Sequence, residues 1–260
     1  MDKRQIMALS SAAALTAALA VPVAVLAEGA HFSYEGDTGP EYWGELDESY
    51  AACAEGMSQS PVDIPADAPV NADDVAYSYG ETAVNIVNNG HAIQVNYDEG
   101  STAVIDGVEY DLVQFHFHSL SEHSVAGENL DMEMHLVHAD ADGNNAVVSA
   151  LIVEGEENPA FAPVWDNMPA EEGDPVTVEG AVVDVSDLLP EDRSYVAYSG
   201  SLTTPACTEG VNWHVLSTPV ELSADQLAAF RAIHDGTNRP IQDWNDRRSE
   251  ERRVGKECRS

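Results

Sequence analysis

Two histidines stand two residues apart in the segment Gln114-Phe-His-Phe-His118. In a β-strand alternate side chains share a face, so Gln114, His116 and His118 would point one way and the two phenylalanines the other. Two imidazoles at this spacing can bind one metal ion, while the phenylalanines can anchor the opposite face in a core. The segment therefore predicts part of a metal site on a buried strand.

A second segment of this kind, Met132-Glu-Met-His-Leu-Val-His138, follows a short distance along the chain. Here Glu133, His135 and Val137 share one face, and His138 faces the other way and is expected to be structural. If the two strands pair antiparallel, His135 completes a site of three histidines that leaves a fourth tetrahedral position for water.

The alternative for each histidine is a structural role, because imidazoles also fill half-buried positions in sheets. Gln114 and Glu133 favour the metal site, since each lies two residues before a histidine on the same predicted face. Both side chains offer an acceptor that can orient the following imidazole. The residues by themselves therefore favour a metal centre.

The elements that must position these side chains are mainly short strands. Two stretches, 158–167 and 223–234, have helical patterns, and Ser223 can cap the second. Apolar or alternating runs bounded by Asn-Gly, Asp-Gly and Glu-Gly turns indicate strands at 83–87, 92–97, 103–105, 112–117, 132–137, 146–152, 176–185, 195–198 and 213–216. We expect a mainly β (α+β) single domain with a central, mostly antiparallel twisted sheet and a few short peripheral helices.

The composition is strongly acidic. Asp and Glu number 46 against 11 Lys and Arg, for a formal charge of -35, and 44% of the residues are hydrophobic, which argues against disorder. Such a surface repels itself at low salt but binds hydrated cations, so it indicates a halophilic protein. It disfavours nucleic acid as a partner. A calcium-binding acidic protein is the alternative, yet no D-x-D-x-D-G loop or nonapeptide repeat occurs.

Both ends of the chain differ from the middle. Residues 1–27 have a basic start, an apolar run rich in Ala, Leu and Val, and a small-x-small pattern ending at Ala27, as in a secretory signal. We expect a periplasmic or secreted protein with its domain at 28–246 and no membrane span after processing. A retained membrane anchor is the alternative, which Pro22 disfavours.

Residues 247–260 form a basic tail that does not match the acidic chain before it. We expect a poorly ordered and non-native extension, in which Cys258 is a free thiol. Cys53 and Cys207 lie inside the expected domain, and an oxidising compartment permits a disulfide between them. The sequence alone does not establish the geometry of that bond.

Seven short motifs are spread over most of the chain. They are Tyr34-Glu-Gly with Gly39-Pro-Glu-Tyr-Trp-Gly44, Gln59-Ser-Pro-Val-Asp-Ile64, Asn89-Gly-His91, Gln114-Phe-His-Phe-His118, Ser121-Glu-His123, Glu133-Met-His-Leu-Val-His138 and Gly200-Ser-Leu-Thr-Thr-Pro205. In this order and at these spacings the chain resembles an α-class carbonic anhydrase of a bacterial, secreted and halophilic type. The departures from the family pattern are Phe32, Tyr42 and Ala206, where Trp, His and Pro are frequent, and the basic C-terminal end.

The resemblance implies a zinc enzyme that interconverts carbon dioxide and water with bicarbonate and a proton. It implies that His116, His118 and His135 hold Zn²⁺, and that a bound hydroxide attacks carbon dioxide. Neutral imidazoles leave such a site net positive, which lowers the pKa of a bound water to about 7. Thr203 then accepts the hydrogen bond of the hydroxide, and Glu122 takes the threonine's own proton, which orients the nucleophile.

The resemblance also assigns the surroundings of the metal. His91 matches the proton shuttle, a role suited to a histidine because its pKa lies near neutrality. The polar residues of the proton path are Tyr34, Asn89 and Gln94, and the substrate-binding residues are Val137, Val147, Leu202, Trp213 and Thr204. Cys53 and Cys207 match the cysteines that bridge in bacterial members. His123 matches a buried histidine bonded to Tyr198.

The resemblance implies sulfonamide or anion inhibitors beside the small-molecule substrate. It also favours a homodimer, although the acidic surface opposes close self-association at low salt. One alternative is a catalytically silent, carbonic-anhydrase-like zinc-binding module. Another is a zinc-buffering or acidic structural protein. The retained histidines, Thr203 and Glu122 disfavour both alternatives.

Overall fold

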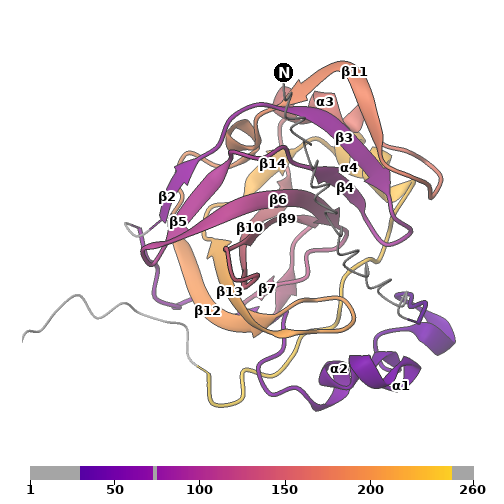
Figure 1. The fold of residues 1–260 in the computed structure, drawn as a ribbon, viewed down its shortest axis with the longest axis vertical. Coiled ribbons are helices and arrows are strands. Elements are labelled where there is room, and N and C mark those ends of the chain that lie inside the picture. Colours follow the sequence, from indigo (N-terminus) through magenta and orange to yellow (C-terminus); the bar gives the residue numbers. More distant parts are fainter. Residues whose placement is uncertain (1–29, 73–74, 248–260) are drawn as a thin grey trace, which may run out of the picture.

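The computed structural model describes residues 30–72 and 75–247. Within them, eleven strands form one twisted sheet in the order β11-β3-β4-β6-β9-β10-β13-β12, with β14 beside β10 and the β2–β5 ribbon beside β6 (Figure 1). The members are β2 (Val75–Ser78), β3 (Thr82–Asn88), β4 (Ile93–Asn96), β5 (Thr102–Ile105), β6 (Val108–His118), β9 (Met132–Ala139), β10 (Asn145–Glu154), β11 (Val176–Val183), β12 (Tyr195–Ser201), β13 (Glu209–Leu216) and β14 (Val220–Leu222).

A second, small sheet and a few short helices complete the described chain. The small sheet joins β1 (Asp63–Ile64), β7 (Ser124–Val125) and β8 (Glu128–Asn129). The α-helices are α1 (Trp43–Leu46), α2 (Ala52–Glu55), α3 (Ala162–Trp165) and α4 (Ala224–Arg231), and the 3-10 helices are η1 (Gly36–Thr38), η2 (Glu48–Tyr50), η3 (Pro159–Phe161) and η4 (Val185–Leu188). This confirms the predicted fold class. Most strand pairs are antiparallel, and β10 pairs parallel with β13 and β14.

The long strands β6 and β9 bring the predicted metal ligands together. They pair antiparallel, with His116 opposite His135. On the other face of β6, Phe115 and Phe117 are fully buried. The Phe117 ring meets Phe230 of α4 at a centroid distance of 6.0 Å. The sheet therefore separates a histidine face from an apolar core that α3 and α4 cover.

The predicted helix at 158–167 is wrong in its extent. The structure has a 3-10 turn, η3, followed by the one-turn helix α3. Pro159 begins η3 and Pro163 is the second residue of α3, because proline suits a first turn and cannot donate a hydrogen bond further in. The helix predicted at 223–234 is shorter than expected, although Ser223 does cap it in a capping box with Gln226.

The short elements lacked a sequence signal. The strands β1, β7 and β8 have two residues each, which is too short to show an alternating pattern. Among the described residues no helix is long and apolar enough to span a membrane. The predicted signal at 1–27 lies outside the described residues, as does most of the predicted tail.

Candidate metal centre

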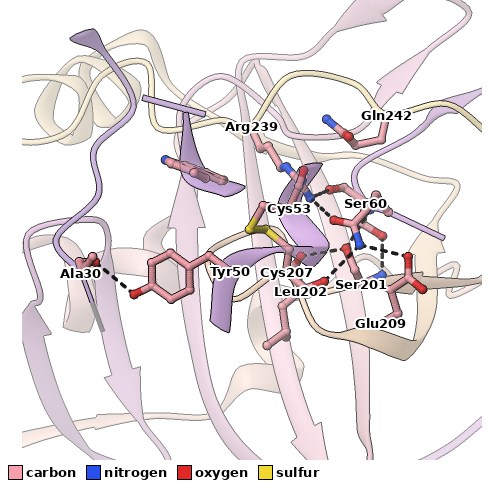
Figure 2. The surroundings of a disulfide bond; sticks show 12 residues. Ala30, Tyr50, Cys53, Ser60, Ser201, Leu202, Cys207, Glu209, Arg239 and Gln242 are labelled. Atoms are coloured by element: carbon pink, nitrogen blue, oxygen red, sulfur yellow. Dashed lines mark hydrogen bonds between the residues drawn. A yellow bond between two sulfur atoms is a disulfide. The ribbon is translucent and has the colours of Figure 1, made fainter. Parts of the chain in front are cut away.

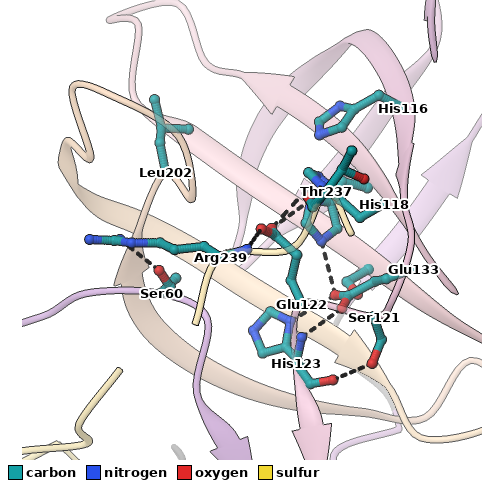
Figure 3. Close-up of polar contacts among 12 residues, drawn as sticks. Ser60, His116, His118, Ser121, Glu122, His123, Glu133, Leu202, Thr237 and Arg239 are labelled. Atoms are coloured by element: carbon teal, nitrogen blue, oxygen red, sulfur yellow. Dashed lines mark hydrogen bonds and ion pairs between the residues drawn. The ribbon is translucent and has the colours of Figure 1, made fainter. Parts of the chain in front are cut away.

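Three imidazoles converge on the histidine face of β6 and β9. One ring nitrogen from each of His116, His118 and His135 lies within 4.8 Å of the others. The ring centroids are 4.7 to 5.2 Å apart. Figure 3 shows His116 and His118 of β6 pointing to the same side of the sheet. The structure therefore assembles the predicted ligand set.

The outer nitrogen of each ring faces an oxygen acceptor, which fixes the ring. His118 Nδ1 lies 2.7 Å from the Thr237 carbonyl oxygen. His116 Nδ1 lies 2.8 Å from Gln114 Oε1, and His135 Nε2 lies 2.9 Å from Glu133 Oε1. With a proton on each outer nitrogen, the inner nitrogens are free to bind a metal.

The inner nitrogen of His118 provides a test of whether a metal fits here. This Nε2 atom is buried and has no hydrogen-bond partner, which is costly unless something binds it. Burial also lowers the pKa of His116, His118 and His135, so all three are neutral near pH 7. Three neutral imidazoles suit Zn²⁺, which prefers tetrahedral nitrogen or sulfur ligands.

A buried chain of hydrogen bonds lies behind His135. Glu133 Oε1 is 2.7 Å from His123 Nδ1, and His123 Nε2 is 2.6 Å from the Tyr198 hydroxyl, as the family resemblance implied. The Tyr198 hydroxyl in turn lies 2.9 Å from Ser60 Oγ. Burial would raise the pKa of Glu133, but His123 and His135 hold it well below its usual range. The ionised carboxylate therefore orients His135.

Glu122 lies between the metal ligands and the C-terminal segment. Its Oε2 atom is 3.6 Å from His118 Nε2 and 3.9 Å from His135 Nδ1. Its Oε1 atom accepts a hydrogen bond of 2.9 Å from the Arg239 amide (Figure 3). Burial raises the pKa of Glu122 to about 7, while His135, the Arg239 amide and the Thr203 hydroxyl oppose that rise. Thr203 and Glu122 therefore adjoin the site, as predicted.

The predicted apolar wall is a row across three neighbouring strands. Val137 of β9 pairs with Val147 of β10, which pairs with Trp213 of β13. The three side chains share one cluster with Leu202, and the Trp213 ring lies 4.9 Å from that of His135. An apolar surface thus adjoins the polar centre.

The predicted proton-path residues lie at the ends of β3 and β4 and in the N-terminal segment. His91 stacks on Phe32 at 3.8 Å, and its amide donates to Asn89 Oδ1. Gln94 pairs with the metal-ligand strand β6 opposite His116, and its Oε1 atom accepts from Asn89 Nδ2 at 3.4 Å. The Tyr34 hydroxyl is buried with no hydrogen-bond partner.

A disulfide joins Cys53 of α2 to Cys207, whose Cα atoms are 5.0 Å apart (Figure 2). This confirms the predicted bridge. The Cys207 amide donates to the carbonyl of Thr204 at 2.8 Å, and Gln59 Nε2 donates to the Cys207 carbonyl at 3.1 Å. The bridge therefore fixes the loop that carries Thr203 and Thr204.

The sequence did not single out Thr237 and Arg239, which hold His118 and Glu122. Thr237 acts through its backbone carbonyl, for which side-chain chemistry gives no signal. A signal for Arg239 did exist. It is one of three basic residues, with Arg193 and Arg231, between residues 28 and 246.

Comparison with known proteins places the whole architecture in one family. Residues 38–254 match the family model of eukaryotic-type carbonic anhydrases. Carbonic anhydrases of Klebsiella pneumoniae and Nostoc sp. are 43% and 39% identical over 90% and 85% of this chain, which is 96% and 86% of their own lengths. The α-carbonic anhydrase of Thermovibrio ammonificans, solved with the inhibitor sulfanilamide, shares 44% identity and superposes with a TM-score of 0.82, covering 86% of this chain and 100% of that one. The chain therefore belongs to the α-class carbonic anhydrase family.

Proposed function

We propose that this protein catalyses the reversible hydration of carbon dioxide to bicarbonate and a proton. The observation that carries the proposal is the convergence of His116, His118 and His135, with the buried His118 Nε2 left without a hydrogen-bond partner. The carbonic anhydrases at about 40% identity support the same reaction.

The inner nitrogens of the three histidines would hold Zn²⁺ through Nε2 of His116, Nε2 of His118 and Nδ1 of His135. When bound, the ion supplies Lewis acidity that brings the pKa of a water to about 7. Gln114, Glu133 and the Thr237 carbonyl keep the three rings oriented toward it. The donor set leaves one tetrahedral position for the reacting oxygen.

Thr203 and Glu122 orient the attacking oxygen. The Glu122 carboxylate accepts a hydrogen bond from the Thr203 hydroxyl, so the threonine oxygen is left to accept a hydrogen bond from the nucleophile. This directs a lone pair of the nucleophile at the substrate. The low exposure of Thr203, 6%, keeps bulk water from competing for its hydroxyl.

The apolar row of Val137, Val147, Leu202 and Trp213 holds carbon dioxide beside the polar centre. Carbon dioxide is apolar and forms weak hydrogen bonds, so an apolar wall binds it without retaining the charged product. Thr204, adjacent to Thr203, contacts bicarbonate.

His91 carries the released proton to solvent, with Tyr34, Asn89 and Gln94 holding the water molecules between. Burial and the neighbouring His31 lower the pKa of His91, while Glu172 opposes them. A half-buried imidazole with these neighbours can exchange protons with buffer near neutral pH.

The same proposal covers the protein's setting. Residues 1–27 act as an export signal, the domain spans 28–246, and the enzyme works in the periplasm or outside the cell. The charge of -35 suits saline surroundings. The assembly is a homodimer.

The deciding experiment measures zinc content and stopped-flow carbon dioxide hydration on the purified protein, with and without a sulfonamide. A sulfonamide is the appropriate probe because sulfanilamide is the inhibitor in the Thermovibrio ammonificans structure. We expect one zinc per chain and hydration that the sulfonamide abolishes. A zinc-loaded protein without hydration activity would instead support the catalytically silent binding module.

A further inference from the structure

The irregular segment from Thr237 to Arg239 touches the metal centre at two points. The Thr237 carbonyl oxygen lies 2.7 Å from His118 Nδ1, and the Arg239 amide donates to Glu122 Oε1 at 2.9 Å. Both contacts come from the backbone, so they depend on where the segment itself is held. It follows α4, beyond the last described helix or strand. Its first residue is paired with Ser119, just after β6: the Thr237 amide donates to the Ser119 carbonyl, and the Ser119 amide donates to the Thr237 hydroxyl at 3.1 Å.

The Arg239 side chain fixes the other end of this segment. Its Nη1 atom donates to Gln59 Oε1 at 2.9 Å and to the Ser60 carbonyl at 2.8 Å, and its Nη2 atom donates to the Cys53 carbonyl at 3.0 Å. The guanidinium also lies over the Trp43 ring, 5.7 Å from its centroid. Figure 2 shows Arg239 directed toward Cys53 and Ser60 beside the disulfide.

The chemistry of this site suits arginine. Arg239 is only 2% exposed, and its acceptors are carbonyl and amide oxygens. Burial lowers its pKa to about 10, so the side chain is still charged near neutral pH. A planar fork of donors can reach three acceptors on two different segments, whereas a lysine ammonium would reach fewer from one point.

We propose that Arg239 is a positioning residue of the metal centre. Its guanidinium fastens residues 237–239 to α2 and to the segment before β1, and this holds the Thr237 carbonyl against His118 and the Arg239 amide against Glu122. The inference rests on the proposed zinc site. It adds that the disulfide-linked N-terminal part of the chain helps set the geometry of that site.

The test compares Arg239→Lys with Arg247→Lys. Arg247 is a matched control because its guanidinium also donates to backbone carbonyls, those of Ser199 and Gln59, and lies over the rings of Tyr198 and Trp244. Its own segment supplies neither the carbonyl on His118 nor the amide on Glu122. Each variant is measured for thermal stability, for zinc affinity by chelator competition, and for the visible spectrum of the Co²⁺ form.

We expect Arg239→Lys to raise the zinc dissociation constant by about tenfold, the lower end of the effects seen when groups orienting metal ligands are lost. The Co²⁺ spectrum should change with it. Arg247→Lys should keep the zinc affinity and Co²⁺ spectrum of the wild type, even if its thermal stability falls as much as that of Arg239→Lys. Wild-type affinity and spectrum in Arg239→Lys would overturn the inference, as would equal losses of zinc affinity in both variants.

A milder variant keeps the test decisive if Arg239→Lys fails to fold. Gln59→Ala removes one acceptor of the guanidinium, and we expect a smaller loss of zinc affinity in the same direction. Unchanged affinity in Gln59→Ala would then overturn the inference. If the wild-type protein itself binds no zinc, the proposed function fails, and this inference falls with it.

Discussion

The two oxygens of the Glu122 carboxylate have different surroundings. One of its oxygens is held by the Arg239 amide, and the other is buried near two histidines with no hydrogen-bond partner. A carboxylate so placed can interact only with the few groups around it, among them the Thr203 hydroxyl. Its proposed part in the reaction therefore depends on Thr203.

Replacing Thr203 by alanine tests this dependence. We expect Thr203→Ala to lower kcat/KM for hydration by about 100-fold, the order of loss that follows when a reacting group is misplaced. Zinc content should stay at the wild-type level, because Thr203 is not a proposed ligand. Thr203→Ser retains the hydroxyl and should recover most of the activity. Full activity in Thr203→Ala would contradict the assigned role.

The effect of replacing His91 on turnover should depend on the buffer concentration. We expect His91→Ala to slow turnover in weak buffer by at least about tenfold, since positioned proton transfer contributes factors of this order or more. Added imidazole should restore part of the rate, and strong buffer should hide the defect. An unchanged rate in weak buffer would remove His91 from the proton path.

At the scale of elements, β9 and β13 each bury a histidine outside the metal centre. Burial lowers the pKa of His138 in β9 and of His214 in β13 to about 4. His138 is bonded to the Tyr79 hydroxyl and the Leu136 carbonyl, which fits its predicted structural role. His214 Nδ1 is buried and has no hydrogen-bond partner.

These two histidines predict a loss of stability in mild acid. Below pH 6.5 these histidines become protonated in the unfolded chain, whereas in the folded protein they stay neutral until about pH 4. The free energy of unfolding therefore decreases as the pH is lowered. By linkage each site costs about 2 kcal/mol at pH 5. Denaturant unfolding at pH 7 and pH 5 checks this, with His214→Asn as the comparison. If the variant shows the same fall as the wild type, His214 is not responsible.

The metal ligands could be predicted because β6 and β9 are long enough to alternate. Alternate residues of a strand share a face, so the sequence shows which side chains lie together. Antiparallel pairing of the two strands then allows few registers that bring their histidines to the same face. The helix at 158–167 could not be bounded in this way, since Pro159 and Pro163 favour separate short turns. The contacts of Thr237 and Arg239 depend on where a segment without regular structure lies, and no local pattern encodes that.

At the scale of the whole molecule, the acidic surface has few cations to balance it. The described chain holds four arginines. One of them, Arg231, forms an ion pair with Asp131, in which Nη2 lies 3.0 Å from Oδ1. The predicted tail begins at Arg247, yet this residue packs against Tyr198 and Trp244. Four arginines therefore leave the negative charge of the described chain largely unbalanced.

This imbalance predicts stabilisation by salt. At 1 M salt the Debye length is about 3 Å, so repulsion between surface carboxylates is largely screened. We expect the melting temperature to rise by at least about 5 °C between dilute buffer and 1 M NaCl, which corresponds to about 2 kcal/mol for a domain of this size. Equal stability in both solutions would argue against salt adaptation.

The disulfide has a consequence for the integrity of the chain. Cys53 and Cys207 are 154 residues apart, and the three histidines, Glu122 and Thr203 all lie between them. A single protease cut anywhere in that stretch opens a covalent ring without releasing a fragment. The disulfide keeps the two pieces covalently joined beside Arg239. A cleaved molecule can therefore retain all the proposed zinc ligands until a reductant breaks the disulfide.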